Sequence, residues 1–197
     1  MTNRREFLQI GLAASTWPLA SRAARAAGVA EAATLPLYKV VYDARFPASV
    51  AFARHAATLG ASVVGIDGDM TRFWYDDLYH RWREGPVAIA GLTAHGPLFC
   101  FEQLARDQRM RVVFRAEHRP AANDCVAHAL VGPAALVENA RLEPADAGWA
   151  ERMAELVTRC PPGRAEIVVA ERTSRGSLPA DAADSLYSWV IAPAVRI

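Results

Sequence analysis

The chain has 197 residues, of which 52% are hydrophobic and 22% are charged, and its formal net charge is +1. This length predicts a single domain, and the ordinary balance of apolar and charged residues excludes long disorder, collagen-like structure and a coiled coil. Every uninterrupted apolar stretch is shorter than the roughly 18 residues that a membrane-spanning helix needs, so we expect no membrane span in the mature chain.

The N-terminus carries paired arginines, then an aromatic and an aliphatic residue: Arg4, Arg5, Phe7 and Leu8. A short apolar segment over residues 10–20 follows, and Ala24 and Ala26 form an A-x-A cleavage pattern. The segment resembles a twin-arginine (Tat) signal peptide, from whose preferred residues Asn3 and Gln9 depart. The resemblance implies recognition by the Tat translocase and export of the folded protein to the bacterial periplasm.

Cleavage near Ala26 divides the chain into a signal peptide over residues 1–26, a linker over 27–36 and a single α/β domain over 37–197. The signal peptide carries a net charge of +3, so the mature chain carries about −2. A nearly neutral chain shows no broad attraction to nucleic acid. We therefore expect no nucleic-acid partner.

The mature chain alternates between short apolar runs, which predict strands, and longer segments with apolar residues at helical spacing, which predict helices. In chain order, the pattern predicts strand 37–42, helix 47–59, strand 61–66, helix 71–83, strand 87–92, helix 97–109, strand 111–116, loop 117–131, helices 133–139 and 146–159, and strands 167–170 and 186–192.

Strands that alternate with helices favour parallel pairing, and continuously apolar strands are typical of a sheet covered on both faces. We therefore expect a three-layer α/β/α fold with a mostly parallel, Rossmann- or flavodoxin-like sheet of about five or six strands. No helix is predicted between the last two strands, which leaves the last strand free to run antiparallel at an edge.

A ligand site in such a fold lies beyond the carboxyl ends of the strands, where the strand order reverses. With the order 2-1-3-4, this crevice falls between the first and third strands. It would gather an acid, a base and the start of a helix, and the candidate ligand-binding residues are Asp43, Arg45, Thr93, His95 and Glu117. The sequence contains no glycine-rich nucleotide motif and no G-x-S-x-G motif, so no cofactor is predicted.

A second group of candidates lies in the predicted loop 117–131. His118, Cys125 and His128 are residue types that bind zinc or copper, although a firm zinc signature would show two close pairs. A disulfide between Cys125 and Cys160 is an alternative use of Cys125 in an oxidising compartment. An incidental histidine in a loop is the third interpretation.

The predicted helix over residues 71–83 is the most aromatic part of the chain. Its aromatic residues include Trp74, Tyr75, Tyr79 and Trp82. One interpretation is a helix that covers the sheet and directs its tryptophans into the core. The other is a partner-binding surface, because aromatic residues are enriched at the centres of interfaces.

These observations leave two classes of function open. The leading hypothesis is a non-catalytic accessory subunit or partner of another exported protein, such as an oxidoreductase, because the export signal is that of a folded cargo and no cofactor motif accompanies it. The alternative is a small-molecule-binding domain or an enzyme that uses the crevice. The sequence does not decide whether the protein is an enzyme.

Overall fold

The computed structural model describes residues 34–143, 145, 147–178 and 185–194, which all belong to a unit spanning residues 33–197. The signal peptide predicted over residues 1–26 lies outside the described residues, as does most of the linker predicted over 27–36. No helix in the described ranges has the length and apolar character needed to cross a membrane.

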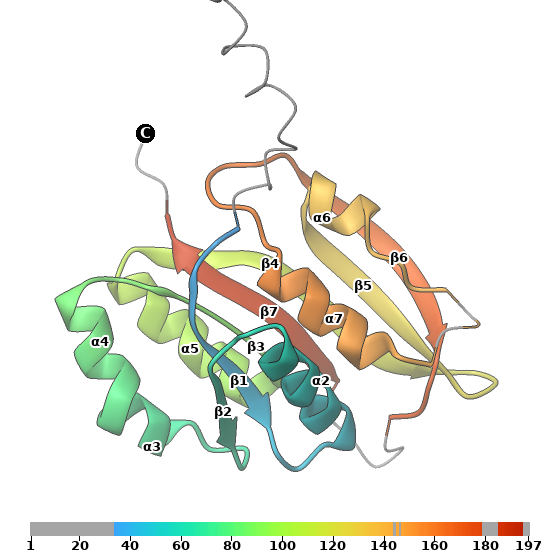
Figure 1. The fold of residues 1–197 in the computed structure, drawn as a ribbon, viewed down its shortest axis with the longest axis horizontal. Coiled ribbons are helices and arrows are strands. Elements are labelled where there is room, and N and C mark those ends of the chain that lie inside the picture. Colours follow the sequence, from blue (N-terminus) through green and yellow to red (C-terminus); the bar gives the residue numbers. More distant parts are fainter. Residues whose placement is uncertain (1–33, 144, 146, 179–184, 195–197) are drawn as a thin grey trace, which may run out of the picture. The chain divides into compact units, whose positions relative to one another are not determined.

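Strands and helices alternate in the first half of the domain, and long antiparallel strands dominate the second half (Figure 1). The strands are β1 (Leu37–Asp43), β2 (Val63–Ile66), β3 (Ala88–Ala94), β4 (Met110–Ala121), β5 (Cys125–Pro133), β6 (Ile167–Arg175) and β7 (Leu186–Pro193). The helical segments are α2 (Pro47–Thr58), α3 (Thr71–Phe73), the π-helical turn η1 (Trp74–Leu78), α4 (Tyr79–Glu84), α5 (His95–Asp107), α6 (Ala134–Glu138) and α7 (Trp149–Thr158).

The strands form one seven-stranded sheet with the order β2-β1-β3-β7-β4-β5-β6. Strand β1 is parallel to β2 and β3, whereas each of the other neighbouring pairs is antiparallel. The prediction of a mostly parallel, Rossmann- or flavodoxin-like sheet is therefore wrong. The sheet is mixed, and most of its pairs are antiparallel.

Strand β7 explains part of this difference. It runs antiparallel to its neighbours, but it lies between β3 and β4 rather than at an edge. Its residues from Leu186 to Ala192 are all buried, which is the pattern of a central strand covered on both faces. The insertion of β7 also makes the assumed order 2-1-3-4 incorrect, because β3 and β4 are not neighbours.

The segment predicted as a loop over residues 117–131 is instead most of the β4–β5 hairpin. Buried Val126, His128 and Leu130 alternate with half-buried neighbours, which is the period of a strand with one face on the core. The turn uses Asn123 and Asp124 with φ values of 59° and 52°, a backbone conformation that these two residue types tolerate well. The sequence did not show this alternation of apolar and polar residues, because two of the inward-facing positions of the hairpin are the histidines His118 and His128.

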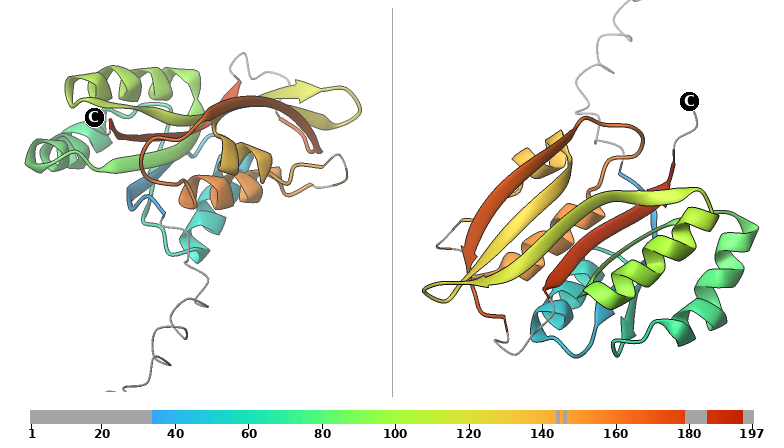
Figure 2. Two further views of the ribbon diagram at one scale, coloured as in Figure 1. Left: turned by 90° about the horizontal axis from the view of Figure 1, so that it is seen from above. Right: turned by 180° about the vertical axis from the view of Figure 1, so that it is seen from behind.

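Helices cover the two faces of the sheet unequally (Figure 2). Helices α2, α6 and α7 lie on one face, where the core includes Phe52, Leu130 and Met153. Helices α4 and α5 lie on the other face, around Phe101 and Trp189. On that second face, α5 packs against the first part of β4, whereas β5 and β6 have no helix over them in the described part of the chain (Figure 2, right). We call this surface the open face.

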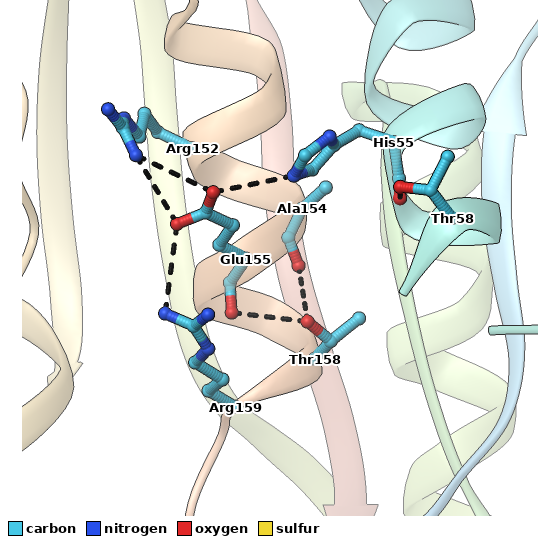
Figure 3. A network of polar contacts seen from close by, with 7 residues as sticks. All are labelled: His55, Thr58, Arg152, Ala154, Glu155, Thr158 and Arg159. Atoms are coloured by element: carbon cyan, nitrogen blue, oxygen red, sulfur yellow. Dashed lines mark hydrogen bonds and ion pairs between the residues drawn. The ribbon is translucent and has the colours of Figure 1, made fainter. Parts of the chain in front are cut away.

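On the face of the sheet that carries α2, α6 and α7, helices α2 and α7 lie side by side and are joined by a charged contact (Figure 3). His55 on α2 lies with its Nε2 atom 3.4 Å from the Glu155 carboxylate on α7. Arg152 and Arg159 approach the same carboxylate at 3.5 and 3.7 Å. Glu155 is therefore the shared anion of a network that joins the two helices.

Candidate functional site

Asp43 and Arg45, at the carboxyl end of β1, form an ion pair. The Asp43 carboxylate is fully buried and accepts two hydrogen bonds from the Arg45 guanidinium, at 2.9 and 2.7 Å. Gly68, in the loop after β2, has a φ of +73°, and a Cβ atom there would lie 2.4 Å from the guanidinium carbon. The absence of a side chain at Gly68 thus makes room for Arg45, and the pair anchors the two loops.

Thr93 lies beside Asp43, because the register of β1 and β3 pairs the preceding residues Tyr42 and Leu92. The buried Thr93 hydroxyl donates to the Ala94 carbonyl and accepts a 3.0 Å hydrogen bond from the Trp189 indole N–H. The structure therefore brings Asp43, Arg45 and Thr93 to one end of the sheet, where internal partners occupy their polar atoms.

His95 and Glu117 lie near Tyr187 of β7, which is also the register partner of Thr93 on β3. The His95 ring lies 5.5 Å from the Tyr187 ring, and Glu117 is the register partner of Tyr187 on β4. Because β7 separates β3 from β4, Glu117 lies two strand spacings from β3, or about 10 Å. Four of the five crevice candidates thus come from β1, β3 and the residues that follow them, and the central position of β7 separates Glu117 from Asp43, Arg45 and Thr93.

The structure brings two of the three metal candidates together. His118 and His128 are register partners on β4 and β5, are fully buried, and have Nδ1 atoms 2.7 Å apart. Cys125 is three residues before His128, and side chains at odd separations along a strand point to opposite faces. Cys125 therefore faces away from the histidines, and no group of three metal-ligating side chains forms within the described ranges.

The two histidines form the middle of a polar chain across four adjacent strands. His118 Nε2 lies 2.8 Å from the Ser188 hydroxyl on β7, and His128 Nε2 lies 2.8 Å from the Ser174 hydroxyl on β6. The Trp149 ring of α7 packs on both imidazoles, at 4.6 and 5.4 Å. Every ring nitrogen of the pair thus has a partner, in a site that substrate cannot reach.

Burial keeps both imidazoles neutral. It lowers the pKa of His128 to about 4, and burial together with the neighbouring His128 lowers the pKa of His118 well below its usual 6.5. Two neutral rings can share one Nδ1 proton, one donating and the other accepting. The pair is therefore a hydrogen-bonded link between strands.

The predicted disulfide between Cys125 and Cys160 is not formed, and Cys100, Cys125 and Cys160 are all free. Cys125 is the first residue of β5. Cys160 lies near the opposite end of this strand, because the next residue, Pro161, lines the same cavity as Pro133, the last residue of β5. Eight residues of strand separate the two ends of β5, about 27 Å, far beyond the reach of a disulfide. Burial also raises the pKa of Cys160 to about 11, which keeps this thiol protonated.

The aromatic helix is partly core. Trp82 is buried and donates a 3.0 Å hydrogen bond to the Val87 carbonyl, and Trp74 packs against Tyr79 and Trp82. Tyr75, in contrast, is 63% exposed. Three of the four aromatic residues proposed for a partner therefore pack against one another, with Trp82 buried and Trp74 and Tyr79 half-buried, and Tyr75 is exposed to solvent.

The same helical segment contains the π-helical turn η1, which begins at Trp74. Within this turn, Asp77 accepts a hydrogen bond from the Tyr38 hydroxyl. This hydrogen bond is the main reason that the pKa of Tyr38 is raised. The guanidinium of Arg81 lies 5.7 Å from the Tyr38 ring. The π-helical turn is thus tied to β1.

A cleft that the sequence reasoning missed lies where β4 and β5 part. Strand β4 pairs with β7 from Met110, but it pairs with β5 only from Arg115 onward. Gly132 and Pro133 of β5 pair with β6 instead. A register shift between Val112 and Phe114 marks the place where β4 bends away.

This opening has a volume of about 580 Å³ and is lined by three arginines, Arg111, Arg115 and Arg164, together with Glu102 and apolar residues that include Val131 and Ile167. We call it the arginine cleft. Arg115 is 3.8 Å from the Glu102 carboxylate and lies over the Tyr187 ring at 4.6 Å. Arg111 and Arg164 are exposed and have no ion pair or hydrogen bond from their side chains to any described residue. Among the described residues, the cleft therefore carries two cations that form no ion pair.

No signal in the sequence identified this cleft, because its arginines come from β4 and from the segment after α7 and meet only in the fold. Arginine is the main basic residue throughout the chain, so neither position stood out by composition. Comparisons with known proteins give no further guide, since no family model, curated protein or solved structure matches this chain.

Proposed function

We propose that this protein binds a small anionic ligand in the arginine cleft. The observation that carries the proposal is the placement of Arg111 and Arg164 in the wall of one cavity without an acidic partner in the described part of the chain. A guanidinium can donate two parallel hydrogen bonds to a carboxylate or phosphate, so an anion would use donors that the protein leaves available.

The dimensions and charge of the cleft support this function. Its volume of about 580 Å³ lies within the range of small-molecule sites. The lining contains three arginines and a single acid, Glu102, so its charged side chains favour an anion. Arg115 is held by Glu102 and Tyr187, which gives the cleft one fixed wall.

Calorimetric titration of the purified protein with acetate, octanoate, citrate and inorganic phosphate tests the proposal. The double variant Arg111→Ala/Arg164→Ala should weaken binding of the preferred anion by about tenfold or more, since charge-assisted hydrogen bonds are lost. The control Arg54→Ala/Arg175→Ala removes the same charge at exposed positions outside the cleft lining and should leave the affinity unchanged. Absence of binding by all four anions would refute the function.

The accessory role remains a second candidate, favoured by the open face. Val131, Ile167 and Val169 are 40, 55 and 71% exposed at neighbouring positions of β5 and β6. Exposed apolar groups of this kind are common where another protein docks. If this function is correct, wild-type protein should retain a specific periplasmic partner that Val169→Lys loses, whereas retention of the same proteins by both would contradict it.

We also propose export through the Tat pathway, on the resemblance of residues 1–26 to a Tat signal peptide. Replacing both arginines, Arg4→Lys/Arg5→Lys, should leave uncleaved precursor in the cytoplasm, because the arginine pair is the defining part of the pattern. Cell fractionation with immunoblotting measures this. The control Arg22→Lys/Arg25→Lys keeps the pair and should be exported, and unchanged export of the first variant would contradict the pathway.

A further inference from the structure

Part of the lining of the arginine cleft is apolar. Val131 of β5 is 40% exposed and Ile167 of β6 is 55% exposed, and both line the cleft together with Pro133 and Pro161. Most large apolar side chains of the domain are buried instead. A bare inorganic anion would gain nothing from this wall, because apolar surface favours contact with other apolar groups over contact with water.

Gly132 of β5 and Phe114 of β4 pack against each other beside the split between the strands. A Cβ atom at Gly132 would lie 2.7 Å from the Phe114 ring, so the ring packs directly against the bare backbone of β5. Phe114 is fully buried and also lines the cleft. The Phe114 ring thus closes the split between β4 and β5 on the side of the core, and the exposed apolar groups of the lining are Val131 and Ile167.

Cationic and apolar groups therefore line the same cavity. Arg111 and Arg115 come from β4 and Arg164 from the segment before β6, whereas Val131 and Ile167 come from β5 and β6. A ligand that satisfies both kinds of wall needs a negatively charged end and an apolar body. A carboxylate suits the charged end, since its two oxygens match the paired N–H donors of a guanidinium.

We propose that the ligand of the arginine cleft is a small amphiphilic carboxylate, a free acid with an aliphatic or aromatic body. The carboxylate lies on Arg111 and Arg164, and the apolar body covers Val131 and Ile167. This inference rests on the proposed anion-binding function and adds the chemical class of the ligand.

The test compares octanoate, acetate and inorganic phosphate by titration calorimetry at equal ionic strength, below the micelle concentration of octanoate. Octanoate should bind at least about tenfold more tightly than acetate or phosphate, because only octanoate offers apolar surface to the wall. Equal affinities for the three probes would overturn the amphiphilic ligand and leave the anion-binding function intact. Binding of none of these three probes would overturn the amphiphilic ligand, and if citrate also fails to bind, the anion-binding function is overturned with it.

Variants of the apolar wall separate this inference from simple charge attraction. Ile167→Ser and Val131→Thr should each weaken octanoate severalfold and leave acetate unchanged. Val169→Ser is the matched control, because Val169 is 71% exposed on the same strand as Ile167 but does not line the cleft. An equal loss of octanoate affinity in Val169→Ser would mean non-specific adsorption and would overturn the inference.

A peptide that ends in an apolar residue carries the same chemistry in another form. A hexapeptide with a free C-terminal leucine and its amidated counterpart therefore form a second arm of the titration. Octanoate should bind more tightly than either peptide. A free-acid peptide that binds more than about tenfold tighter than octanoate would overturn the small-acid assignment in favour of a protein terminus.

Discussion

At the scale of single residues, polar groups that the sequence offers as a ligand site are used internally. Asp43 is buried and bound to Arg45, and the Thr93 hydroxyl lies between the Trp189 indole and the Ala94 carbonyl. A buried carboxylate needs such a partner, because an unpaired charge away from water is strongly unfavourable. Residue type at the end of a strand thus indicated that Asp43 and Thr93 lie at one end of the sheet but could not indicate whether their polar groups remain available to a ligand.

The histidine pair gives a prediction at this scale. His128→Leu should lower the free energy of unfolding by roughly 1–3 kcal/mol, because it leaves His118 Nδ1 and the Ser174 hydroxyl buried without their partner. His118→Leu should have a similar effect. Urea unfolding monitored by tryptophan fluorescence measures both.

The double variant His118→Leu/His128→Leu completes a double-mutant cycle. Its loss of stability should be smaller than the sum of the two single losses, since removing both rings removes the unpaired nitrogens together. Simple additivity would contradict the direct link between the two imidazoles.

At the scale of elements, the helices and the first three strands follow from local periodicity. Expected and observed helices agree closely for α2, Pro47–Thr58, which begins at a proline, and for α7, Trp149–Thr158, which precedes two prolines. The β4–β5 hairpin was missed because its core-facing positions include His118 and His128, and period-two alternation is visible only when the inward residues are apolar.

Helices α2 and α7 provide the prediction at this scale. Glu155→Gln should lower the free energy of unfolding by about 0.5–1 kcal/mol, since the neutral amide weakens the contacts with His55, Arg152 and Arg159 (Figure 3). The value is modest because the Glu155 side chain is 25% exposed and water screens its charge. Thermal or urea unfolding at low salt measures it.

Salt dependence and a matched substitution test the cause. The difference between wild type and Glu155→Gln should shrink in 1 M NaCl, where the screening length falls to about 3 Å. Glu138→Gln, at an exposed position of α6, should change stability little at either salt concentration. A loss at Glu155 that does not depend on salt would indicate a packing effect instead.

At the scale of the whole molecule, stability should fall in mild acid. Burial holds the pKa of His128 at about 4, against a usual 6.5, and also lowers that of His118. Between pH 4 and pH 6.5, the unfolded chain binds protons that the folded protein does not. The free energy of unfolding therefore rises with pH in this range and is lost as the pH falls from 6.5 towards 4. His128 alone should account for about 3 kcal/mol at pH 4.

The measurement is the free energy of unfolding from pH 7 to pH 4 in wild type and His128→Leu. The variant should show a shallower decline, because its leucine takes up no proton. His80→Gln, at an exposed position, serves as the control and should follow the wild-type profile. Parallel curves for wild type and His128→Leu would contradict the neutral buried state of His128.

The sequence by itself determined the positions of most helices and strands, since each depends on propensity and apolar period over about ten neighbouring residues. It also determined the prediction of an export signal, which depends on a short continuous pattern. The tertiary structure decided the rest. Insertion of β7 between β3 and β4 made the sheet mostly antiparallel and separated Glu117 from Asp43, and the parting of β4 from β5 opened the arginine cleft. Strand order depends on contacts between segments that are far apart in the chain, such as β3 and β7. Local periodicity does not show which distant strand each strand pairs with.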